Sequence, residues 1–512
     1  MSLATKLLHA AIVATLSSTA FDARAVVLDS RGVGQVLLFP YYTVNAGNQT
    51  LISVVNTTNR AKAVRVRFLE ARNSKQALGF NVYLSPFDTW TAAVFAQSST
   101  GPASVVTFDT TCTAPRLLPG QPQPFNEFAY SGSNSDHPPS LDATLSAPER
   151  TRDGHIEIIE MGLLQTGTGA TQLAEEATHF NGVPVNCGAV VAAWTPPNGG
   201  WLANPAANID LPRGGLAGAA SIVDVEDGLM ISYRAEALRD FYTNSAAPGA
   251  LHAEPLGAVP DLASADNGNG LAVARVDVPG VGWVQEIFPL PSPRPDAVSL
   301  VLMQSEVLNE FNVDPALGGA TEWVVTFPTK RYYTDVATNA QVRMPFTDAF
   351  RDDGAGREQI QRDFHDREGR ARGGTADGFC PVDVTPPPLR CDTSFDSTVN
   401  VLEVSDEFSL EPTTAIFGAA FSTIAVRLFT QPYYNATPFR SGWASVRFED
   451  AVAPGVEHFM VGPSTGLLYR GVPAIGFSAI RVINSAVQPG LLANYGGAYR
   501  HRGTLRADAI DP

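Results

Sequence analysis

The chain contains 512 residues, with 51 acidic and 35 basic side chains and therefore a net charge of −16 at neutral pH. Nucleic-acid binding depends on concentrated Lys and Arg, so this balance argues against a nucleic-acid partner. The 44 glycines and 38 prolines favour turns and short strands over long helices. The length fits two to four domains, or fewer if these are large β-domains.

The first 25 residues have the pattern of a secretory signal peptide. Lys6 supplies a short positive region, residues 7–16 form an apolar run too short to span a bilayer, and Ala23-Arg24-Ala25 fits the small-x-small cleavage pattern. We therefore expect export and a mature chain that begins at Val26; a buried N-terminal helix is the alternative. No other segment approaches about 18 uninterrupted apolar residues, so no transmembrane segment is predicted.

Residues 50–95 have the alternation expected of antiparallel strands. Val64, Val66 and Phe68 alternate with two arginines, and a period of two places the two sets on opposite faces of a sheet. We expect the apolar set to face a core and the arginines to face water. The pattern predicts an Ig-like β-sandwich over residues 26–110; core strands of another β-fold would differ only in topology.

Residues 111–345 are expected to form a second β-rich region with long loops. Residues 111–152 are rich in Pro, Gly and Ser and would pack over the first sandwich. Strand patterns then return in three places: 154–161, a hairpin over 221–233 that turns at Asp227-Gly228, and 321–333. Two short helices are predicted, at 169–180 and 299–311.

Residues 346–397 interrupt this pattern. The part from 348 to 374 carries many charges of both signs and several glycines, and Pro386-Pro387-Pro388 follows. Such a composition has little apolar surface to bury, so we expect an exposed, partly disordered insertion. Apolar, strand-like runs resume afterwards, and residues 398–512 are expected to form a C-terminal β-rich region that completes the second domain.

Four cysteines lie beyond the predicted cleavage site: Cys112, Cys187, Cys380 and Cys391. In an exported protein disulfides are the default state of such residues. We expect the pairs Cys112–Cys187 and Cys380–Cys391, because the second pair brackets a short proline-rich loop; the other two pairings remain alternatives. A metal site is disfavoured because the chain has neither C-x-x-C nor H-E-x-x-H.

One segment, residues 462–466, matches the G-x-S-x-G nucleophile elbow with Ser464 at its centre. The elbow requires a helix after the serine, and Gly471 and Pro473 oppose one. The acid should also precede the histidine, whereas His501 precedes Asp508 here. We therefore interpret the segment as a hairpin turn and predict no catalytic residue.

Two acidic turns are candidates for calcium binding through hard oxygen ligands. One contains Asp224, Glu226 and Asp227, and the other contains Asp266. Neither turn matches an EF-hand loop, so solvated turns are the simpler interpretation. Calcium is the only cofactor that the residue pattern suggests.

Two further clusters are candidates for a metal site and a sugar-binding site. One group of acids and a histidine lies within the predicted insertion, where a solvated charge run is the favoured interpretation over a metal site: Asp363, His365, Asp366 and Glu368. Several aromatic residues would suit a sugar-stacking platform, although aromatic side chains in strands are more often half-buried: Tyr41, Tyr42, Tyr433, Tyr434 and Trp443.

Several blocks of the chain resemble a family of uncharacterised secreted or cell-surface proteins of Gram-negative bacteria. They are GVGQVLLFPYYTVNAGNQTLISVVNTT (32–58), FNVYLSPFDTWTAAVF (80–95), TEWVVTFPTKRYY (321–333), GVPAIGFSAIRVINSA (471–486) and NYGGAYRHRG (494–503). The resemblance spans most of the predicted mature chain and implies export, with surface display as an expectation. It carries no catalytic motif and therefore assigns no functional residue.

Together these observations predict an exported, mainly β protein of the cell surface, the extracellular space or the periplasm. We expect a structural or adhesive role without a catalytic site, with other envelope proteins or surface glycans as partners. Two alternatives remain. One is a carbohydrate-binding or carbohydrate-degrading protein, and the other is a periplasmic assembly factor that pairs β-strands with a client.

Overall fold

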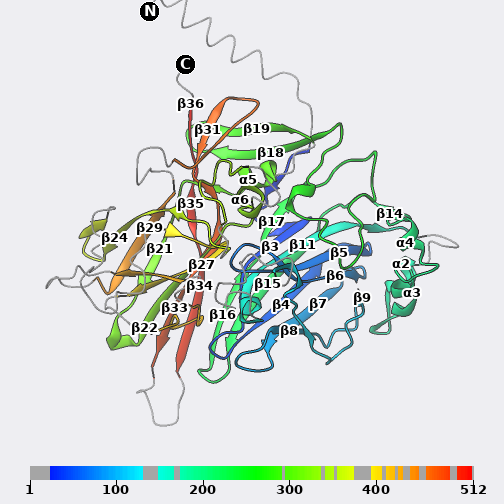
Figure 1. Ribbon diagram of the computed structural model, residues 1–512, viewed down its shortest axis with the longest axis horizontal. Helices are drawn as coiled ribbons and strands as arrows, with labels where there is room; N and C mark the ends of the chain where they lie inside the picture. Colours follow the sequence, from blue (N-terminus) through cyan, green and yellow to red (C-terminus); the bar gives the residue numbers. More distant parts are fainter. Residues whose placement is uncertain are drawn as a thin grey trace, which may run out of the picture.

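The computed structural model describes residues 24–130, 148–166, 173–290, 295–335, 341–350, 354–373, 394–405, 411–420, 425–429, 439–448, 457–484 and 493–509. Their antiparallel sheets form two β-sandwiches that lie side by side (Figure 1). The predicted fold class, a mainly β protein built from antiparallel sandwiches, is confirmed. Within the described residues, no helix is both long and apolar enough to cross a membrane.

The first sandwich consists of a sheet of eight strands and a sheet of seven strands, all antiparallel. The order in the eight-stranded sheet is β1 (Val27–Leu28), β17 (Glu236–Arg239), β3 (Val36–Thr43), β11 (Asp153–Leu164), β5 (Lys62–Glu70), β6 (Gln76–Leu84) and β9 (Cys112–Ala114), with β14 (Ile209–Asp210) beside β11. The order in the other sheet is β10 (Gln123–Pro124), β8 (Ala103–Val106), β7 (Thr89–Ala96), β4 (Asn48–Asn56), β15 (Leu216–Asp224) and β16 (Leu229–Arg234), with β2 (Val33–Gly34) beside β15.

The core of this sandwich contains the apolar side chains that the alternation placed there. Val64, Val66 and Phe68 of β5 are all buried, and the ring of Phe68 lies 4.8 Å from that of Phe125 and 5.8 Å from that of Tyr42. The inward-facing register predicted for this strand is therefore confirmed.

The two arginines of β5 do not face water as we expected. Arg65 and Arg67 are buried, because further chain segments cover the outer face of the eight-stranded sheet. Arg67 forms an ion pair of 2.6 Å with Glu157 of β11, and Arg65 donates to the side-chain oxygen of Asn81 at 3.0 Å and to the carbonyl oxygen of Pro255. When both faces of a sheet are covered, alternate side chains of a strand enter two different buried regions. Here the outer region buries charged side chains, each held by an ion pair or by hydrogen bonds.

The second sandwich consists of two five-stranded sheets. One has the order β25 (Ala371–Gly373), β24 (Gln361–Asp366), β29 (Ser441–Arg447), β21 (Glu306–Asn312) and β35 (Arg502–Thr504). The other has the order β28 (Ala425–Phe429), β27 (Val399–Ser405), β22 (Gly319–Thr326), β33 (Ile475–Ile483) and β34 (Asn494–Arg500), in which β27 and β28 are parallel. Their shared core includes Trp323, Phe364 and Val446.

Smaller elements cover these sheets. The helices are α2 (Leu173–Ala177), α3 (Cys187–Ala192), α4 (Gly200–Ala203), α5 (Asp296–Val301) and α6 (Arg331–Thr334). Short 3-10 helices span Phe128–Tyr130, Pro148–Arg152, Leu262–Ser264 and Pro315–Leu317. The remaining strand pairs are β12 (His179–Phe180) with β13 (Val183–Pro184), β18 (Leu271–Val278) with β19 (Gly282–Pro289), β20 (Met303–Gln304) with β32 (Val472–Pro473), and β23 (Glu358–Gln359) with β26 (Ser394–Phe395). A three-stranded sheet contains β30 (Phe459–Val461), β31 (Leu467–Arg470) and β36 (Arg506–Ala509).

The predicted domain boundaries at 110 and 345 do not separate the two sandwiches. Strands β11, β15, β16 and β17 come from the predicted second region and complete the first sandwich. Strands β21 and β22 come from the same region and belong to the second. Boundaries placed where composition changes follow loops, whereas the sandwiches are assembled from strands distant in sequence.

The described part of the predicted insertion, residues 346–397, is not an exposed segment. Strand β24 lies between β25 and β29, and Ile360, Phe364 and Phe395 are each at most 3 % exposed. These few apolar side chains, spaced among the charges, suffice to cover one edge of the second core. Cys380, Cys391 and Pro386-Pro387-Pro388 lie outside the described residues.

The helix predicted over 299–311 is wrong for most of its length. Helix α5 ends at Val301, and residues 306–312 form β21. Val307, Asn309 and Phe311 are buried while the residues between them are not, so a period of two prevails over the helical stripe. The helix predicted over 169–180 is present in part, as α2.

The two sandwiches share one continuous core. The ring of Tyr233 in β16 stacks on that of Phe477 in β33 at 4.6 Å, and the ring of Tyr41 in β3 lies 5.2 Å from that of Phe417. The buried carboxylate of Glu322 in β22 accepts the backbone N–H of Phe417 at 3.1 Å. Burial raises the pKa of Glu322 to about 7. The second sandwich therefore contributes to the core of the first, in addition to the core between its own two sheets.

Candidate functional site

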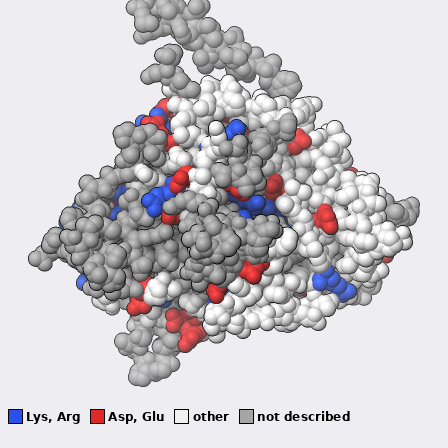
Figure 2. Space-filling model, viewed as in Figure 1, with Lys and Arg blue, Asp and Glu red and all other residues white. Residues whose placement is uncertain are grey.

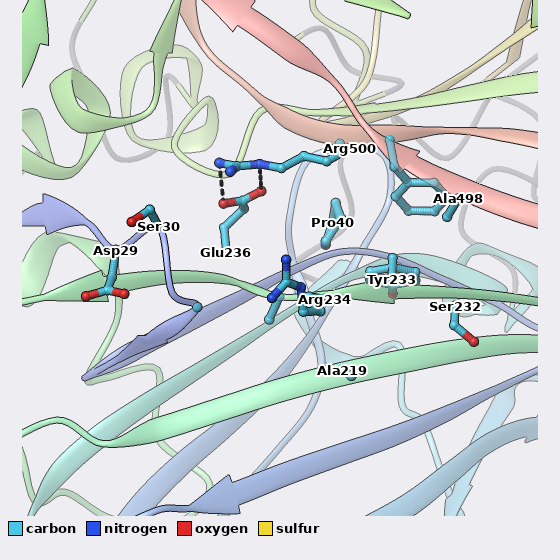
Figure 3. Close-up of a pocket in the computed structure, with 14 residues that line it drawn as sticks. Asp29, Ser30, Pro40, Ala219, Ser232, Tyr233, Arg234, Glu236, Ala498 and Arg500 are labelled. Carbon is cyan, nitrogen blue, oxygen red and sulfur yellow. Dashed lines mark hydrogen bonds and ion pairs between the residues drawn. The ribbon is translucent and has the colours of Figure 1, made fainter. Parts of the chain in front are cut away.

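A cleft of about 310 Å³ lies where the two sandwiches meet (Figure 3). The first sandwich contributes the turn after β1 and the junction of β16 and β17, and the second contributes β33 and β34. We call this space the inter-sandwich cleft. Its charged lining residues are Asp29, Arg234, Glu236 and Arg500, and its walls include Pro40, Phe477 and Ala498.

An ion pair with two contacts crosses this cleft. Arg500 of β34 donates from Nη2 to Glu236 Oε2 at 2.7 Å, and its Nε lies 2.6 Å from Glu236 Oε1. The Glu236 side chain is 12 % exposed and the Arg500 side chain is 58 % exposed. Burial raises the pKa of Glu236, although the charge of Arg500 opposes this effect. The pair ties the second sandwich to β17 of the first.

A second carboxylate of the cleft is also occupied. Asp29 Oδ2 lies 3.1 Å from Arg31 Nη2 and 2.7 Å from Arg239 Nε. Burial alone would raise the pKa of Asp29, but the hydrogen bonds and charge of Arg31, together with the charge of Arg239, outweigh burial and lower it. Both carboxylates that line the cleft are therefore paired with neighbouring arginines.

Arg234 differs from the other charged residues of the cleft. It is the last residue of β16, is exposed, and makes no ion pair or hydrogen bond through its side chain within the described residues. Strand β16 alternates buried and exposed residues, and Tyr233, stacked on Phe477, fixes the end of the strand. In Figure 3 the guanidinium group of Arg234 points toward the Glu236–Arg500 pair.

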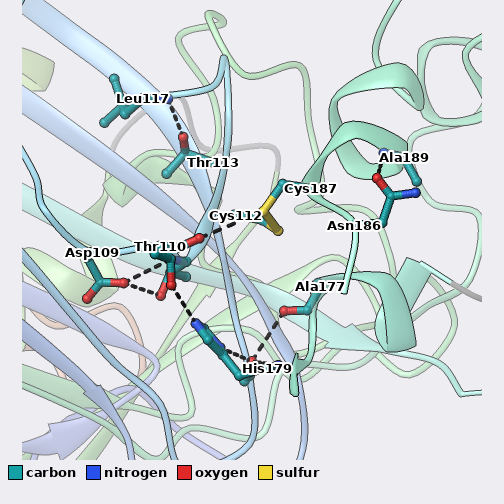
Figure 4. Close-up of a disulfide and its surroundings, with 12 residues drawn as sticks. Asp109, Thr110, Cys112, Thr113, Leu117, Ala177, His179, Asn186, Cys187 and Ala189 are labelled. Carbon is teal, nitrogen blue, oxygen red and sulfur yellow. Dashed lines mark hydrogen bonds between the residues drawn. A yellow bond between two sulfur atoms is a disulfide. The ribbon is translucent and has the colours of Figure 1, made fainter. Parts of the chain in front are cut away.

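The disulfide between Cys112 and Cys187 borders a second hollow, a groove of about 390 Å³ that we call the disulfide groove (Figure 4). The bond joins β9, at the edge of the eight-stranded sheet, to the first residue of α3, and so confirms the predicted pairing. Arg116 is the only charged side chain among the residues that line the groove.

Large apolar side chains are exposed around the disulfide groove. The exposed fractions are 80 % for Phe108, 69 % for Phe180, 59 % for Val185, 52 % for Val183 and 41 % for Leu118. Hydrogen bonds of Thr110 to Gly182 O at 3.5 Å and to His179 Nε2 at 3.4 Å hold the two sides together. Figure 2 shows few charged side chains on this face of the molecule over α2, α3 and α4.

The Ser464 segment is a hairpin turn between β30 and β31, as we predicted. The backbone N–H of Ser464 donates to the buried carboxylate of Glu286 at 2.7 Å, and its hydroxyl accepts from the N–H of Ile287 at 3.0 Å. His501 and Asp508 make no hydrogen bond to Ser464; His501 contacts Asn309 and Asp508 pairs with Arg470. These contacts dock the turn against β19.

The calcium candidates cap turns. Asp224 Oδ1 accepts the backbone N–H groups of Glu226 at 2.9 Å and Asp227 at 3.0 Å, and Asp266 Oδ1 accepts that of Gly268 at 2.7 Å. In the part of the chain that the structure describes, no group of three or more His, Cys, Asp or Glu side chains is placed to hold a metal ion.

Those aromatic residues of the proposed sugar platform that the structure describes are not brought together. Tyr41 and Tyr42 are fully buried in the first core, and Tyr433 and Tyr434 lie outside the described residues. Trp443 is 40 % exposed and stacks on His365 at 4.0 Å on the outer surface of the second sandwich.

The second sandwich contains a buried cluster of titratable groups that no sequence pattern indicates. Lys330, Glu358 and His458 are each at most 1 % exposed, and Nζ of Lys330 lies 3.7 Å from Glu358 Oε1. Burial raises the pKa of Glu358 to about 7 and lowers that of Lys330. Lys330 also donates to the carbonyl oxygen of Gly356, and His458 Nδ1 lies 2.8 Å from that of Pro345. Their contacts join segments of the second sandwich.

The charges of this cluster are far apart in sequence, so no local motif could have revealed it. The same holds for the inter-sandwich cleft, whose residues come from six segments. Comparison of the chain with protein-family models, with curated proteins and with solved structures finds no match.

Proposed function

We propose that this chain is an exported protein of the cell envelope or cell surface, with a structural or adhesive role carried out by binding. The observation that carries the proposal is the Cys112–Cys187 disulfide beside a groove with exposed apolar side chains at Val183 and Val185. Disulfides of this kind persist in oxidising compartments outside the cytoplasm, and contiguous exposed apolar surface is typical of protein contact sites. The signal-like residues 1–25 and the resemblance to secreted proteins support the same compartment.

The chemistry of the groove favours an extended, uncharged segment of another envelope protein as the partner. Strand β9 is the edge strand of its sheet, and the other side of the groove contains the short strand β13 and the start of α3. An edge strand offers unpaired backbone groups to an added strand. This arrangement also supports the second candidate function, a periplasmic assembly factor that pairs strands with a client.

The compartment is tested by fractionating the source cells and alkylating thiols before and after reduction. We expect the mature N-terminus at Val26, and Cys112 and Cys187 alkylated only after reduction. An intact Met1 terminus in the cytoplasm with reduced cysteines would overturn the proposal.

The contact is tested with a photo-crosslinking residue at Val185 in intact cells, with Val225 as the control. Val225 is 72 % exposed and lies at the turn between β15 and β16, outside the groove. We expect a discrete adduct from position 185 that is absent from position 225. If protease added to intact cells degrades the adduct, the protein is displayed on the surface. If the adduct is protected from the protease, the partner is a periplasmic client. Equal adducts from both positions would contradict the groove as a contact site.

A further inference from the structure

The inter-sandwich cleft is lined by two arginines and two carboxylates, in a chain that is strongly negative overall. Four arginines gather in and beside it, against two carboxylates: Arg31, Arg234, Arg239 and Arg500 against Asp29 and Glu236. The chain as a whole carries a net charge of −16. The cleft therefore offers arginine side chains to a ligand although acidic residues predominate in the chain.

The pairing within the cleft leaves donors unused. Glu236 accepts two contacts from Arg500, and Asp29 pairs with Arg31 and Arg239. Arg234 makes no ion pair within contact distance among the described residues, although its charge favours the ionised form of Glu236 and so opposes the rise that burial causes in the pKa of that carboxyl. The hydroxyl of Ser30, also exposed in the lining, makes no hydrogen bond within the same part of the chain.

The geometry points to a binding site for a small organic anion, a carboxylate or a phosphate monoester, held by Arg234 in the inter-sandwich cleft. A guanidinium group presents a planar fork of donors that matches carboxylate and phosphate oxygens. The cleft volume of about 310 Å³ is at the small end of ligand sites. Pro40, Phe477 and Ala498 provide an apolar wall, so the anionic group would be attached to an apolar body. This inference does not depend on the proposed function.

Glu236 is expected to affect anion affinity in the opposite direction to Arg234. Its carboxylate lies in the same cleft and repels an anion, while it also holds two donors of Arg500. Removing its charge should strengthen anion binding, whereas removing the charge of Arg234 should weaken it. A merely structural role for either residue would not produce opposite effects on affinity.

The test is calorimetric titration of the full chain with phenyl phosphate, benzoate and, as an uncharged probe, benzyl alcohol. We expect binding of at least one anion and not of the alcohol. Binding of phenyl phosphate alone, or of benzoate alone, identifies which anionic group the site takes. Arg234→Gln should raise the Kd by roughly tenfold or more, as expected for a lost hydrogen bond to a charged group, and Glu236→Gln should lower it.

Arg116→Gln is the matched control. Arg116 is exposed, without an ion pair among the described residues, and lines the disulfide groove instead of the cleft. It should leave the Kd unchanged, so that loss of net positive charge alone is not mistaken for loss of the site. The proposal is overturned if neither anion binds the unmodified chain, or if Arg116→Gln and Arg234→Gln weaken binding equally.

Discussion

Arg500 holds Glu236 through two contacts of 2.6 and 2.7 Å although the two residues are 264 positions apart in the chain. The pair links the last strands of the second sandwich to a strand of the first. Removing one partner leaves the other charge uncompensated, and the cost grows with its burial.

Arg500→Gln should therefore destabilise the chain more than the double variant Arg500→Gln/Glu236→Gln. Because the Arg500 side chain is 58 % exposed, solvent screens much of the interaction, and we expect the single change to cost only about 1 kcal/mol. Urea unfolding of both variants and of Glu236→Gln gives the coupling energy. A coupling energy of zero would mean that the pair does not tie the sandwiches together.

Phe68→Ala should lower the free energy of unfolding by about 3–5 kcal/mol, as truncations of core phenylalanines do. Phe68 is fully buried and contacts the rings of Tyr42, Phe80 and Phe125. Phe180→Ala, at a position that is 69 % exposed, is the matched control and should change stability by less than about 0.5 kcal/mol. Similar losses from both substitutions would show that the register of β5 is wrong.

Glu70 predicts part of the acid sensitivity of the fold. Burial alone would raise the pKa of Glu70, but Arg150 and the backbone N–H groups of Asn73 and Arg72 outweigh it and lower the pKa to about 2. A folded pKa below the unfolded value of 4.5 stabilises the protein above about pH 4.5, and this contribution is lost as the pH falls toward 2.

Glu70→Gln should therefore be destabilising at pH 7, by about 3 kcal/mol from the pKa difference, and this deficit should shrink as the pH falls. Chemical unfolding of both proteins between pH 7 and the onset of acid unfolding measures the difference. Glu226→Gln makes the same change at an exposed turn and should give a small, pH-independent difference. A deficit for Glu70→Gln that stays constant with pH would contradict the lowered pKa.

The segment around β24 should be protected from protease and needed for stability, contrary to what its composition suggests. Replacing residues 351–374 with a Gly/Ser bridge removes β24, its pairing with β29 and the buried ring of Phe364. We expect this variant to unfold at markedly lower urea concentration. Trypsin should cut slowly at Arg362, the second residue of β24. An unchanged unfolding midpoint would restore the interpretation of this segment as an insertion.

Local alternation was sufficient to predict the strands of the first sandwich and the Ser464 turn, because each depends on residues close in sequence. It misplaced Arg65 and Arg67, since alternation reports that two faces differ and not whether the second face is covered. It also missed β24, where a few apolar side chains among many charges are enough for a strand that lies between β25 and β29.

The candidate clefts could not be predicted for a different reason. Arg234 and Arg500 lie in separate strands, and their proximity depends on how the two sandwiches meet. Only the disulfide groove gave a sequence signal, through Cys112 and Cys187, because covalent pairing restricts the number of solutions to three. The exposed apolar residues around it are spread over several loops, so no continuous apolar run marks them.

The stacking of Tyr233 on Phe477 means that residues synthesised late complete the core of the first sandwich. Synthesis proceeds from the N-terminus, so every strand of the first sandwich exists long before Phe477, Phe417 and the strands that carry them. Until those residues arrive, the first sandwich exposes the apolar surface that they will cover, and partly assembled sheets of this kind are prone to aggregate. The first sandwich can therefore complete its core only after Phe417 and Phe477 have been synthesised.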